Sequence, residues 1–369
     1  MGSKEKIVEW LERHRDDGTV KVLTGLRGTG KSTAVDCYCK RLVASGVSSP
    51  HIITIDFGSS IYRSIRTTND TLALIDAYTL TDDRYYVFID EPFDAEGFGE
   101  LAERLRSRKN LDLTVISSNA RILSSLRGNA TTFEVRSGAD AFPHLQELKK
   151  NRQQQNDYME GLWSTIFLRD VAVLDKAVDC RLMEHIAEYL TLHLGEATSL
   201  RQIGAGAALL AGGRAPAPST ISEYFTVLLN SHLFSKALRF DIFNHETNNR
   251  GYRVFSPCPD LLARRFGPIS GSYAALNRIW NCLRSKWQDV FTGRTANSEI
   301  DFVTRTHDQY AYFQYIERIE SASDIDRLTQ PFAEIDDDFP RTLIVGRPTR
   351  FTPPDGVSIV TLDRLSRDV

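Results

Sequence analysis

A glycine-rich segment at residues 25–32 carries the strongest chemical signal in the sequence. It reads GLRGTGKS, which fits the pattern G-x-x-x-x-G-K-S/T in full, and it lies between an apolar stretch and a helical pattern. Glycines at this spacing let the backbone wrap a phosphate, so that several N–H groups and the first turn of the helix point at it. We predict a nucleotide-binding loop of Gly25, Leu26, Arg27, Gly28, Thr29, Gly30, Lys31, Ser32 and Thr33.

Two side chains of this loop have specific expected roles. Lys31 should reach the β- and γ-phosphates of the nucleotide, and the hydroxyl of Ser32 should bind Mg²⁺. A chance glycine turn before a helix is the alternative. The strand and helix patterns on the two sides of the loop disfavour that alternative.

A pair of carboxylates follows a second apolar stretch further along the chain. Residues 85–89 (YYVFI) run directly into Asp90 and Glu91. A strand that is buried on both faces should not end in two acids unless a cation compensates them. We predict that Asp90 holds Mg²⁺, directly or through water, and that Glu91 activates the attacking water as a general base. A solvated strand end with a helix cap is the alternative.

A third polar group, residues 117–119 (SSN), follows the next strand pattern. Ligands of open parallel sheets bind beyond the carboxyl ends of the strands, so these residues should share an edge with the loop and the acids. We predict that Asn119 orients the attacking water or senses the γ-phosphate. A cap for a helix over 120–126 is the alternative.

Phosphoryl transfer usually needs a further cation, often an arginine. Arg27, Arg121 and Arg127 are the candidates, and spacing does not select one of them. The basic run at 104–109 is interpreted as a solvated helix face.

The elements that position these residues alternate between strand and helix patterns, which predicts an α/β fold with a parallel sheet covered by helices. Beyond residue 139 the alternation stops, a mainly helical region follows, and a small α/β unit begins near residue 255. The expected strands of the first region are residues 20–24, 51–57, 85–89, 113–117 and 132–135, and its expected helices are 5–15, 32–45 and 97–108.

Composition sets limits on the class of protein. The chain has 369 residues, of which 41% are hydrophobic and 25% charged, so it is a folded chain of more than one domain. A net charge of -3 excludes a global basic field for nucleic acid or membranes. The five cysteines form no metal-binding pattern, and no apolar run is long enough for a membrane span or a signal core. We expect reduced thiols and a cytoplasmic location.

Several strings in the sequence resemble one family. KVLTGLRGTGKST, FIDEP, VISSNARILSS and LRGNATTFEV are similar to the AAA-like archaeal-type P-loop ATPases, which also occur in bacteria. The resemblance spans nearly the whole chain and implies a RecA/AAA-like sheet that binds ATP, a winged-helix middle region and a C-terminal domain related to PD-(D/E)XK nucleases. Two departures leave the arginine finger open: Gly28 follows Arg27 where the family usually has a second arginine, and residues 127–129 read RGN where Gly-Arg is usual.

The middle region resembles a helix-turn-helix at residues 196–203 and 219–225. The second helix should bury Ile221, Tyr224, Phe225 and Leu228, and strands near 238–243 and 251–255 would form a wing. DNA contact through this helix is one hypothesis, and a structural or protein-docking module is the other. Phosphate contacts would have to come from Arg201, Arg214, Lys236 and Arg239.

The C-terminal region resembles the nuclease-like domain through residues 298–303 and 312–316. Asp301 matches one carboxylate of the family pattern, but Gln314 and Ile316 stand in place of the second acid and the lysine, and Asn277 in place of a glutamate. One carboxylate holds catalytic Mg²⁺ poorly, so we predict an inactive domain.

The sequence therefore predicts three modules: residues 1–140 as a P-loop ATPase domain, 141–255 as a helical and winged-helix region, and 256–369 as a nuclease-like domain. The leading hypothesis is a Mg²⁺-dependent ATPase whose nucleotide state moves modules or controls a partner. The alternatives are a nucleotide-gated DNA- or protein-binding adaptor and a metal-dependent nuclease. A homo-oligomer or a protein partner is also expected, since a neighbouring subunit could supply the missing arginine.

Overall fold

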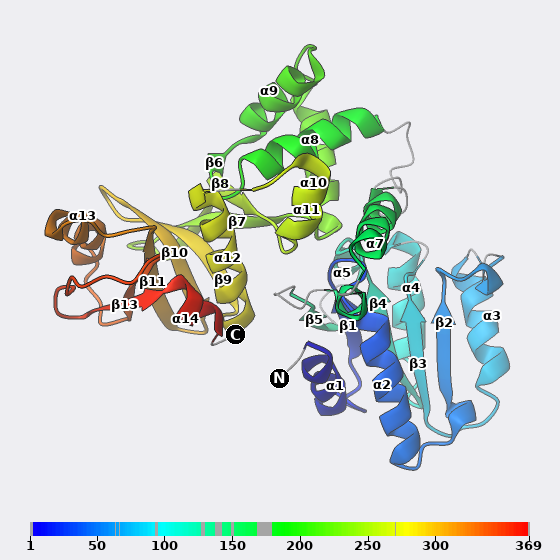
Figure 1. Ribbon diagram of the computed structural model, residues 1–369. Helices are drawn as coiled ribbons and strands as arrows, with labels where there is room; N and C mark the ends of the chain where they lie inside the picture. Colours follow the sequence, from blue (N-terminus) through cyan, green and yellow to red (C-terminus); the bar gives the residue numbers. More distant parts are fainter. Residues whose placement is uncertain are drawn as a thin grey trace. The chain divides into compact units, whose positions relative to one another are not determined.

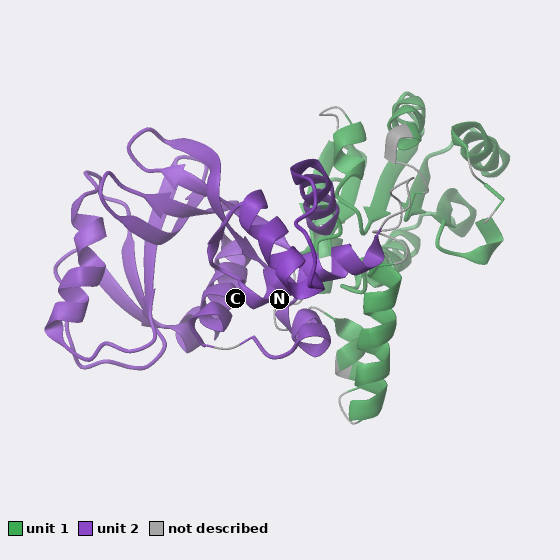
Figure 2. Cartoon of the chain, turned by 90° about the horizontal axis from the view of Figure 1, so that it is seen from above, with its two compact units in different colours: residues 1–173, 230–232 green, residues 174–229, 233–369 purple. Residues whose placement is uncertain are grey.

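The chain forms two compact units in a computed structural model. Unit 1 comprises Met1–Val173 and Asn230–His232, and unit 2 comprises Leu174–Leu229 and Leu233–Val369 (Figure 2). The predicted boundary near residue 255 lies inside unit 2, and the division into three modules stays a prediction. The structure describes residues 3–62, 64–65, 67–92, 95–126, 130–136, 142–148, 151–167, 179–269 and 271–367.

Unit 1 is built on a five-stranded sheet in the order β2-β3-β4-β1-β5, in which all neighbours are parallel (Figure 1). This confirms the predicted α/β fold. The order brings β1 and β3 to the two sides of β4, so the residues that follow these three strands share one edge. The strands are β1 (Val20–Thr24), β2 (Ile52–Asp56), β3 (Tyr85–Asp90), β4 (Leu111–Ser117) and β5 (Ala130–Glu134).

Helices cover both faces of this sheet, and the strand side chains alternate between two cores. Leu23 of β1 packs with α1 and α2, whereas Val20 and Val22 face the side of α3, α4 and α5. The helices of the unit are α1 (Ser3–Arg13), α2 (Lys31–Ala44), α3 (Thr68–Tyr78), α4 (Ala95–Arg106), α5 (Ile122–Ser125), α6 (Pro143–Glu147) and α7 (Arg152–Thr165), with short 3₁₀ turns at Ser49–His51 and Ser60–Tyr62.

The sequence patterns did not predict three of these helices, α3, the short α6 and α7. Helix α3 begins at a capping box, in which the Thr67 side chain accepts from the backbone N–H of Asp70 and the Asp70 carboxylate accepts in return. Helix α7 begins with a polar run, and its apolar residues Met159, Leu162 and Trp163 are buried on one face near its end. Because the first half of α7 is polar, the sequence shows no helical periodicity there.

A buried ion pair joins β1 and β4. Lys21 Nζ lies 2.7 Å from Asp112 Oδ1, and both side chains are almost fully excluded from solvent. The other oxygen of Asp112 accepts a 2.7 Å hydrogen bond from the backbone N–H of Asp16. A buried charge is tolerated when it is paired in this way, and it becomes costly when its partner is removed.

We expect Asp112→Ala to lower the free energy of unfolding of unit 1 by about 3–5 kcal/mol, because it leaves the ammonium of Lys21 buried without its counter-ion. Urea unfolding followed by fluorescence measures the change. The double variant Lys21→Met/Asp112→Leu is the control, since it removes both charges and should be less destabilised than Asp112→Ala. Equal losses in the two proteins would show that the charge of Lys21 is not the cause.

Unit 2 contains an eight-stranded mixed sheet in the order β13-β12-β11-β10-β9-β7-β8-β6. Strand β7 pairs with β8 in antiparallel and with β9 in parallel orientation, so the sheet is continuous across residue 255. The strands are β6 (Ala197–Thr198), β7 (Ser235–Asp241), β8 (Glu246–Phe255), β9 (Asp289–Arg294), β10 (Glu299–Thr306), β11 (Gln309–Ile316), β12 (Arg341–Val345) and β13 (Val357–Thr361).

Among the described residues of unit 2, three helices precede β7 and four follow β8. The four residues predicted for the buried face of the 219–225 helix are all buried, and Gly206 of α9 lies so close to Tyr189 of α8 that a Cβ would meet that ring. The helices are α8 (Cys180–Leu192), α9 (Leu200–Ala211), α10 (Pro218–Asn230), α11 (Pro259–Phe266), α12 (Gly271–Lys286), α13 (Ala322–Ala333) and α14 (Leu362–Arg367).

All five cysteines lie among the described residues and are free thiols. Within the described ranges, we find no helix with both the length and the apolar character that a membrane span requires.

Candidate functional site

The loop between β1 and α2 folds back on itself at its glycines. Gly28 and Gly30 both have a φ of 82°, a left-handed conformation that side chains other than glycine rarely adopt. Gly25 lies so close to Val135 that an added Cβ would stand 2.7 Å from the carbonyl oxygen of that residue. Helix α2 starts directly after Gly30 and has no side-chain cap, so its first N–H groups are available to an anion.

Lys31 lies inside the loop. Its Nζ donates hydrogen bonds to the carbonyl oxygens of Gly25 at 2.6 Å and Leu26 at 3.0 Å, and the residue is only 5% exposed. The hydroxyl of Thr29 donates to the same Leu26 carbonyl at 2.8 Å and tightens the loop. A buried ammonium surrounded by backbone amides is a site for a polyanion.

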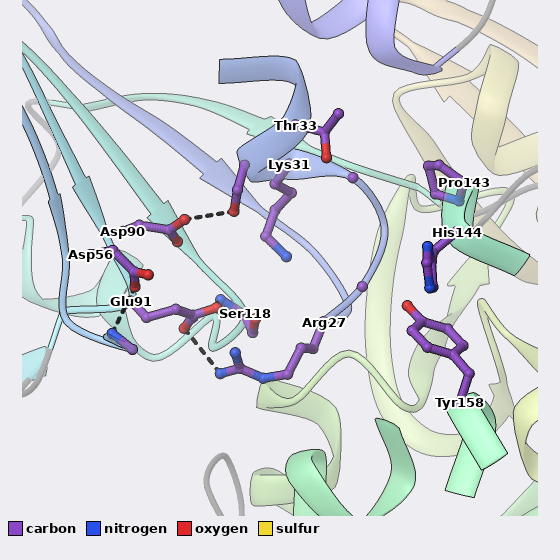
Figure 3. Close-up of a pocket in the computed structure, with 14 residues that line it drawn as sticks. Arg27, Lys31, Thr33, Asp56, Asp90, Glu91, Ser118, Pro143, His144 and Tyr158 are labelled. Carbon is purple, nitrogen blue, oxygen red and sulfur yellow. Dashed lines mark hydrogen bonds and ion pairs between the residues drawn. The ribbon is translucent and has the colours of Figure 1, made fainter. Parts of the chain in front are cut away.

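Ser32 meets Asp90 across the edge of the sheet. The Ser32 hydroxyl donates a 2.5 Å hydrogen bond to Asp90 Oδ2 (Figure 3). Burial, together with the neighbouring carboxylates Glu91 and Asp56, raises the pKa of Asp90 to about 6, and the hydrogen bond from Ser32 opposes this rise. A hydroxyl and a cluster of carboxylates are oxygen ligands of the kind that Mg²⁺ prefers, so the donor set fits that ion.

Asp56 is a site residue that the sequence analysis missed. It is the last residue of β2, and its carboxylate lines the same cavity as Asp90 and Glu91. The sequence did contain a signal for Asp56, since it is an acid at the end of a predicted strand. The carboxyl ends of the strands form the ligand-binding edge of a parallel sheet.

Glu91 is held by three groups. Its carboxylate accepts hydrogen bonds from the hydroxyl and, at 3.2 Å, from the backbone N–H of Ser118, and Oε2 lies 3.3 Å from Nη2 of Arg27. Its φ of +50° is strained for a residue with a side chain, at a cost of about 1–3 kcal/mol. The fold therefore fixes the direction of this carboxylate, and Arg27 pairs with it.

Asn119 lies beside this group, but its side chain takes part in a turn. Its Oδ1 accepts a 2.9 Å hydrogen bond from the backbone N–H of Arg121, which forms a turn before α5, and the N-cap of α5 is Arg121 rather than Asn119. The neighbouring Ser118, and not Asn119, is among the described residues that line the cavity. A catalytic role for Asn119 stays a prediction.

The three candidate arginines have different positions. Arg27 points at Glu91, as described above. Arg121 is exposed in the turn before α5. Arg127 lies outside the described residues.

Residues 230–232 lie far along the chain and still belong to unit 1. Nε2 of His232 is 2.8 Å from the hydroxyl of Thr24, the last residue before the loop, and Nδ1 is 3.7 Å from Oε1 of Glu134. The carbonyl oxygen of Asn230 accepts a 2.8 Å hydrogen bond from the N–H of Ala120. This segment therefore contacts both the start of the loop and the turn after β4, and no local sequence signal indicates it.

We expect His232→Ala to destabilise unit 1 by about 1–3 kcal/mol, because it removes the partner of the buried Thr24 hydroxyl. Thermal and urea unfolding measure the loss. Thr24→Val removes the hydroxyl itself, so the double variant should lose less than the sum of the two single losses. Additive losses would show that the two side chains do not interact.

The remaining wall of the cavity comes from α6 and α7. Pro143, His144 and Tyr158 lie on the side of the loop away from Asp90 and Glu91 (Figure 3). The cavity has a volume of about 400 Å³, which suits a small-molecule ligand.

The predicted nuclease-like site in unit 2 has no comparable donor set. Asp301 Oδ1 lies 3.2 Å from Nη1 of Arg253, and its Oδ2 accepts from the N–H of Tyr315 at 2.9 Å. Gln314 bridges the backbone of Asp301 and Glu299. In unit 2, as in unit 1, the described residues contain no group of three or more His, Cys, Asp or Glu side chains that could hold a metal by themselves.

Comparison with known proteins identifies one region of the chain. Residues 17–137 match the sequence model of the AAA domain, so this stretch is an AAA domain of the P-loop ATPase class. The match contains the loop, Asp90 and Glu91. It does not include α6, α7 or unit 2.

Over its full length the chain is similar to an uncharacterized protein of Haemophilus influenzae, with 25% identity over 397 residues that cover 98% of this chain and 97% of the relative. Among solved structures it is similar to PCH-2 of C. elegans, with 17% identity, a TM-score of 0.29 and coverage of 36% of this chain and 41% of that one. It is also similar to the Aeropyrum pernix ORC1 protein in complex with DNA, with 14% identity, a TM-score of 0.29 and coverage of 70% and 92%.

Proposed function

We propose that this chain binds Mg·ATP in the cavity between the loop and the ends of β2, β3 and β4, and hydrolyses it. The observation that carries the proposal is the 2.5 Å hydrogen bond between Ser32 and Asp90, beside a loop whose lysine lies inside it. The serine of a P-loop and the acid at the end of a neighbouring strand hold Mg²⁺ in P-loop ATPases. The AAA match over residues 17–137 supports the same assignment.

Each residue of the site has a role in this proposal. Lys31 exchanges the carbonyls of Gly25 and Leu26 for phosphate oxygens, and Ser32 and Asp90 hold the metal. When bound, Mg²⁺ neutralises charge on the phosphate oxygens. Glu91 orients a water and accepts its proton.

Arg27 connects nucleotide binding to the general base, Glu91. In the structure its guanidinium pairs with Glu91, and a bound triphosphate would compete for it because both partners are anions. We infer that Arg27 turns to the nucleotide and thereby releases Glu91 to act on water. This assigns Arg27, among the three candidates, as the cation supplied within the chain.

The same contact favours a second candidate function. If Arg27 stays on Glu91 when ATP is bound, the base remains neutralised and the chain is a nucleotide-gated adaptor with little turnover. Steady-state phosphate release from Mg·ATP by the full chain separates the two functions. Turnover that Glu91→Gln abolishes supports the ATPase, and tight ATP binding with no turnover supports the adaptor.

For unit 2 we propose a winged-helix module followed by an inactive nuclease-like domain. The order of α8, α9, α10 and the β7–β8 hairpin supports the first part. Among the four cations expected to contact DNA, Lys236 lies over the ring of Tyr252 and Arg239 pairs with Glu299, so a protein-docking role suits the module better than DNA binding. The guanidinium of Arg253 on Asp301 supports the inactivity of the second part.

A further inference from the structure

The wall that α6 and α7 add to the cavity contains a pair of aromatic rings. The ring centroids of His144 and Tyr158 are 5.0 Å apart, and their planes are inclined by 60°. His144 Nδ1 lies 2.9 Å from Oε2 of Glu147, which fixes the orientation of its ring. Both residues lie beyond the AAA match, which ends at residue 137, and both line the cavity.

This wall is fitted closely to the loop. A Cβ on Gly28 would stand 3.0 Å from the hydroxyl of Tyr158, and a Cβ on Gly30 would stand 2.9 Å from Cγ of Pro143. Gly28 and Gly30, which both have a φ of 82°, are therefore also the two positions where the helices approach the loop. Tyr158 is partly buried and the side chain of His144 is 53% exposed, so aromatic surface remains open to the cavity.

The polar groups of the cavity set the direction of a bound nucleotide. Lys31, Ser32 and Asp90 mark the end that takes the terminal phosphates and the metal. The nucleoside must then extend away from Asp90. Figure 3 shows His144 and Tyr158 on that other side of the loop.

We propose that His144 and Tyr158 form a platform on which the base of a purine nucleoside triphosphate stacks. This inference rests on the proposed function and concerns the base, which is the part of the ligand that the P-loop does not contact. Stacking on an aromatic side chain is favourable for every base and strongest for the larger purine rings. The helices α6 and α7 therefore belong to the nucleotide site.

The test compares nucleotides with the bare polyphosphate chain in calorimetric titrations of the full-length protein. Tyr158→Ala should raise the Kd for Mg·ATP about 5- to 100-fold and change the Kd for Mg·tripolyphosphate less than twofold. Tyr158→Phe keeps the ring and should bind Mg·ATP like the parent. His144→Ala should act in the same direction as Tyr158→Ala, and Tyr78→Ala, at an exposed aromatic residue of α3, is the matched control.

A third ligand makes the test specific for stacking. The parent protein should bind Mg·UTP more weakly than Mg·ATP, and Tyr158→Ala should shrink this difference. If Tyr158→Ala raised the Kd for Mg·ATP and for Mg·tripolyphosphate equally, the platform would be overturned, because Tyr158 would then only support the loop. An unchanged Kd for ATP would overturn it as well. If the parent protein bound neither ATP nor tripolyphosphate, the proposed function would fail, and the platform with it.

Discussion

Replacing Glu91 with glutamine is expected to lower the turnover number for ATP about 10²- to 10³-fold while ATP still binds. General-base catalysis contributes rate factors of this size, and glutamine keeps the shape of the side chain without its basicity. The amide oxygen can still accept the hydrogen bond from the backbone N–H of Ser118 while the amide NH₂ donates to the Ser118 hydroxyl, so the geometry at the end of β3 should be preserved. Phosphate release under saturating Mg·ATP gives the rate, and titration gives the Kd.

The matched control for this variant is Glu100→Gln, which makes the same chemical change at an exposed position on α4. It should leave turnover unchanged. The Kd of Glu91→Gln for ATP carries additional information, because the variant frees Arg27 from its ion pair. Tighter ATP binding is expected if Arg27 then meets the phosphates. An unchanged turnover number in Glu91→Gln would falsify the assignment of Glu91 as the base.

Lys31→Ala is expected to weaken Mg·ATP binding about 10- to 100-fold and to abolish measurable turnover. A hydrogen bond to a charged group contributes about 1.5–3 kcal/mol, and each 1.4 kcal/mol changes an affinity tenfold. In the proposed reaction Lys31 also compensates charge that develops on the transferred phosphoryl group, so its loss should affect the rate as well as the affinity. Calorimetry with Mg·ATP and the phosphate-release assay measure the two effects.

The matched control is Lys40→Ala, which removes an exposed lysine from the same helix, α2. The structure adds one requirement for the interpretation of Lys31→Ala. Since Lys31 also holds the carbonyls of Gly25 and Leu26, circular dichroism and the melting temperature must show that the variant stays folded. A folded Lys31→Ala protein that binds ATP like the parent would rule out the loop as the phosphate site.

Most of the fold of unit 1 and the central part of its site were predictable from the amino-acid sequence. The loop, Asp90 and Glu91 have residue types and spacings that are typical of phosphate and Mg²⁺ binding. A strand pattern precedes each of these segments. The five strands were predicted to within a few residues, and β1, β3 and β4, which are buried on both faces, appear as short apolar runs. Of the missed helices, α3 and α7 lack a continuous apolar stripe.

Other parts of the site depend on contacts between residues that are distant in the chain. The order β2-β3-β4-β1-β5 sets Asp56 and Ser118 on the two sides of the strand end that carries Glu91, and sequence periodicity does not determine strand order. Ser118, which binds Glu91, and Asn119, which takes part in the turn, are consecutive in the chain, and only the path of the backbone after β4 distinguishes their roles.

The amino-acid sequence was thus sufficient where the site is built from neighbouring residues, as in the loop and the two acids, because local spacing fixes which groups these segments present. Packing alone brings His232 to Thr24, turns Arg27 toward Glu91 and sets the rings of His144 and Tyr158 beside the loop. These contacts join segments that are distant in the chain, and no repeating pattern in the sequence indicates that they meet. They form only when the hydrophobic cores have placed the strands and helices, and that placement is a property of the folded chain as a whole.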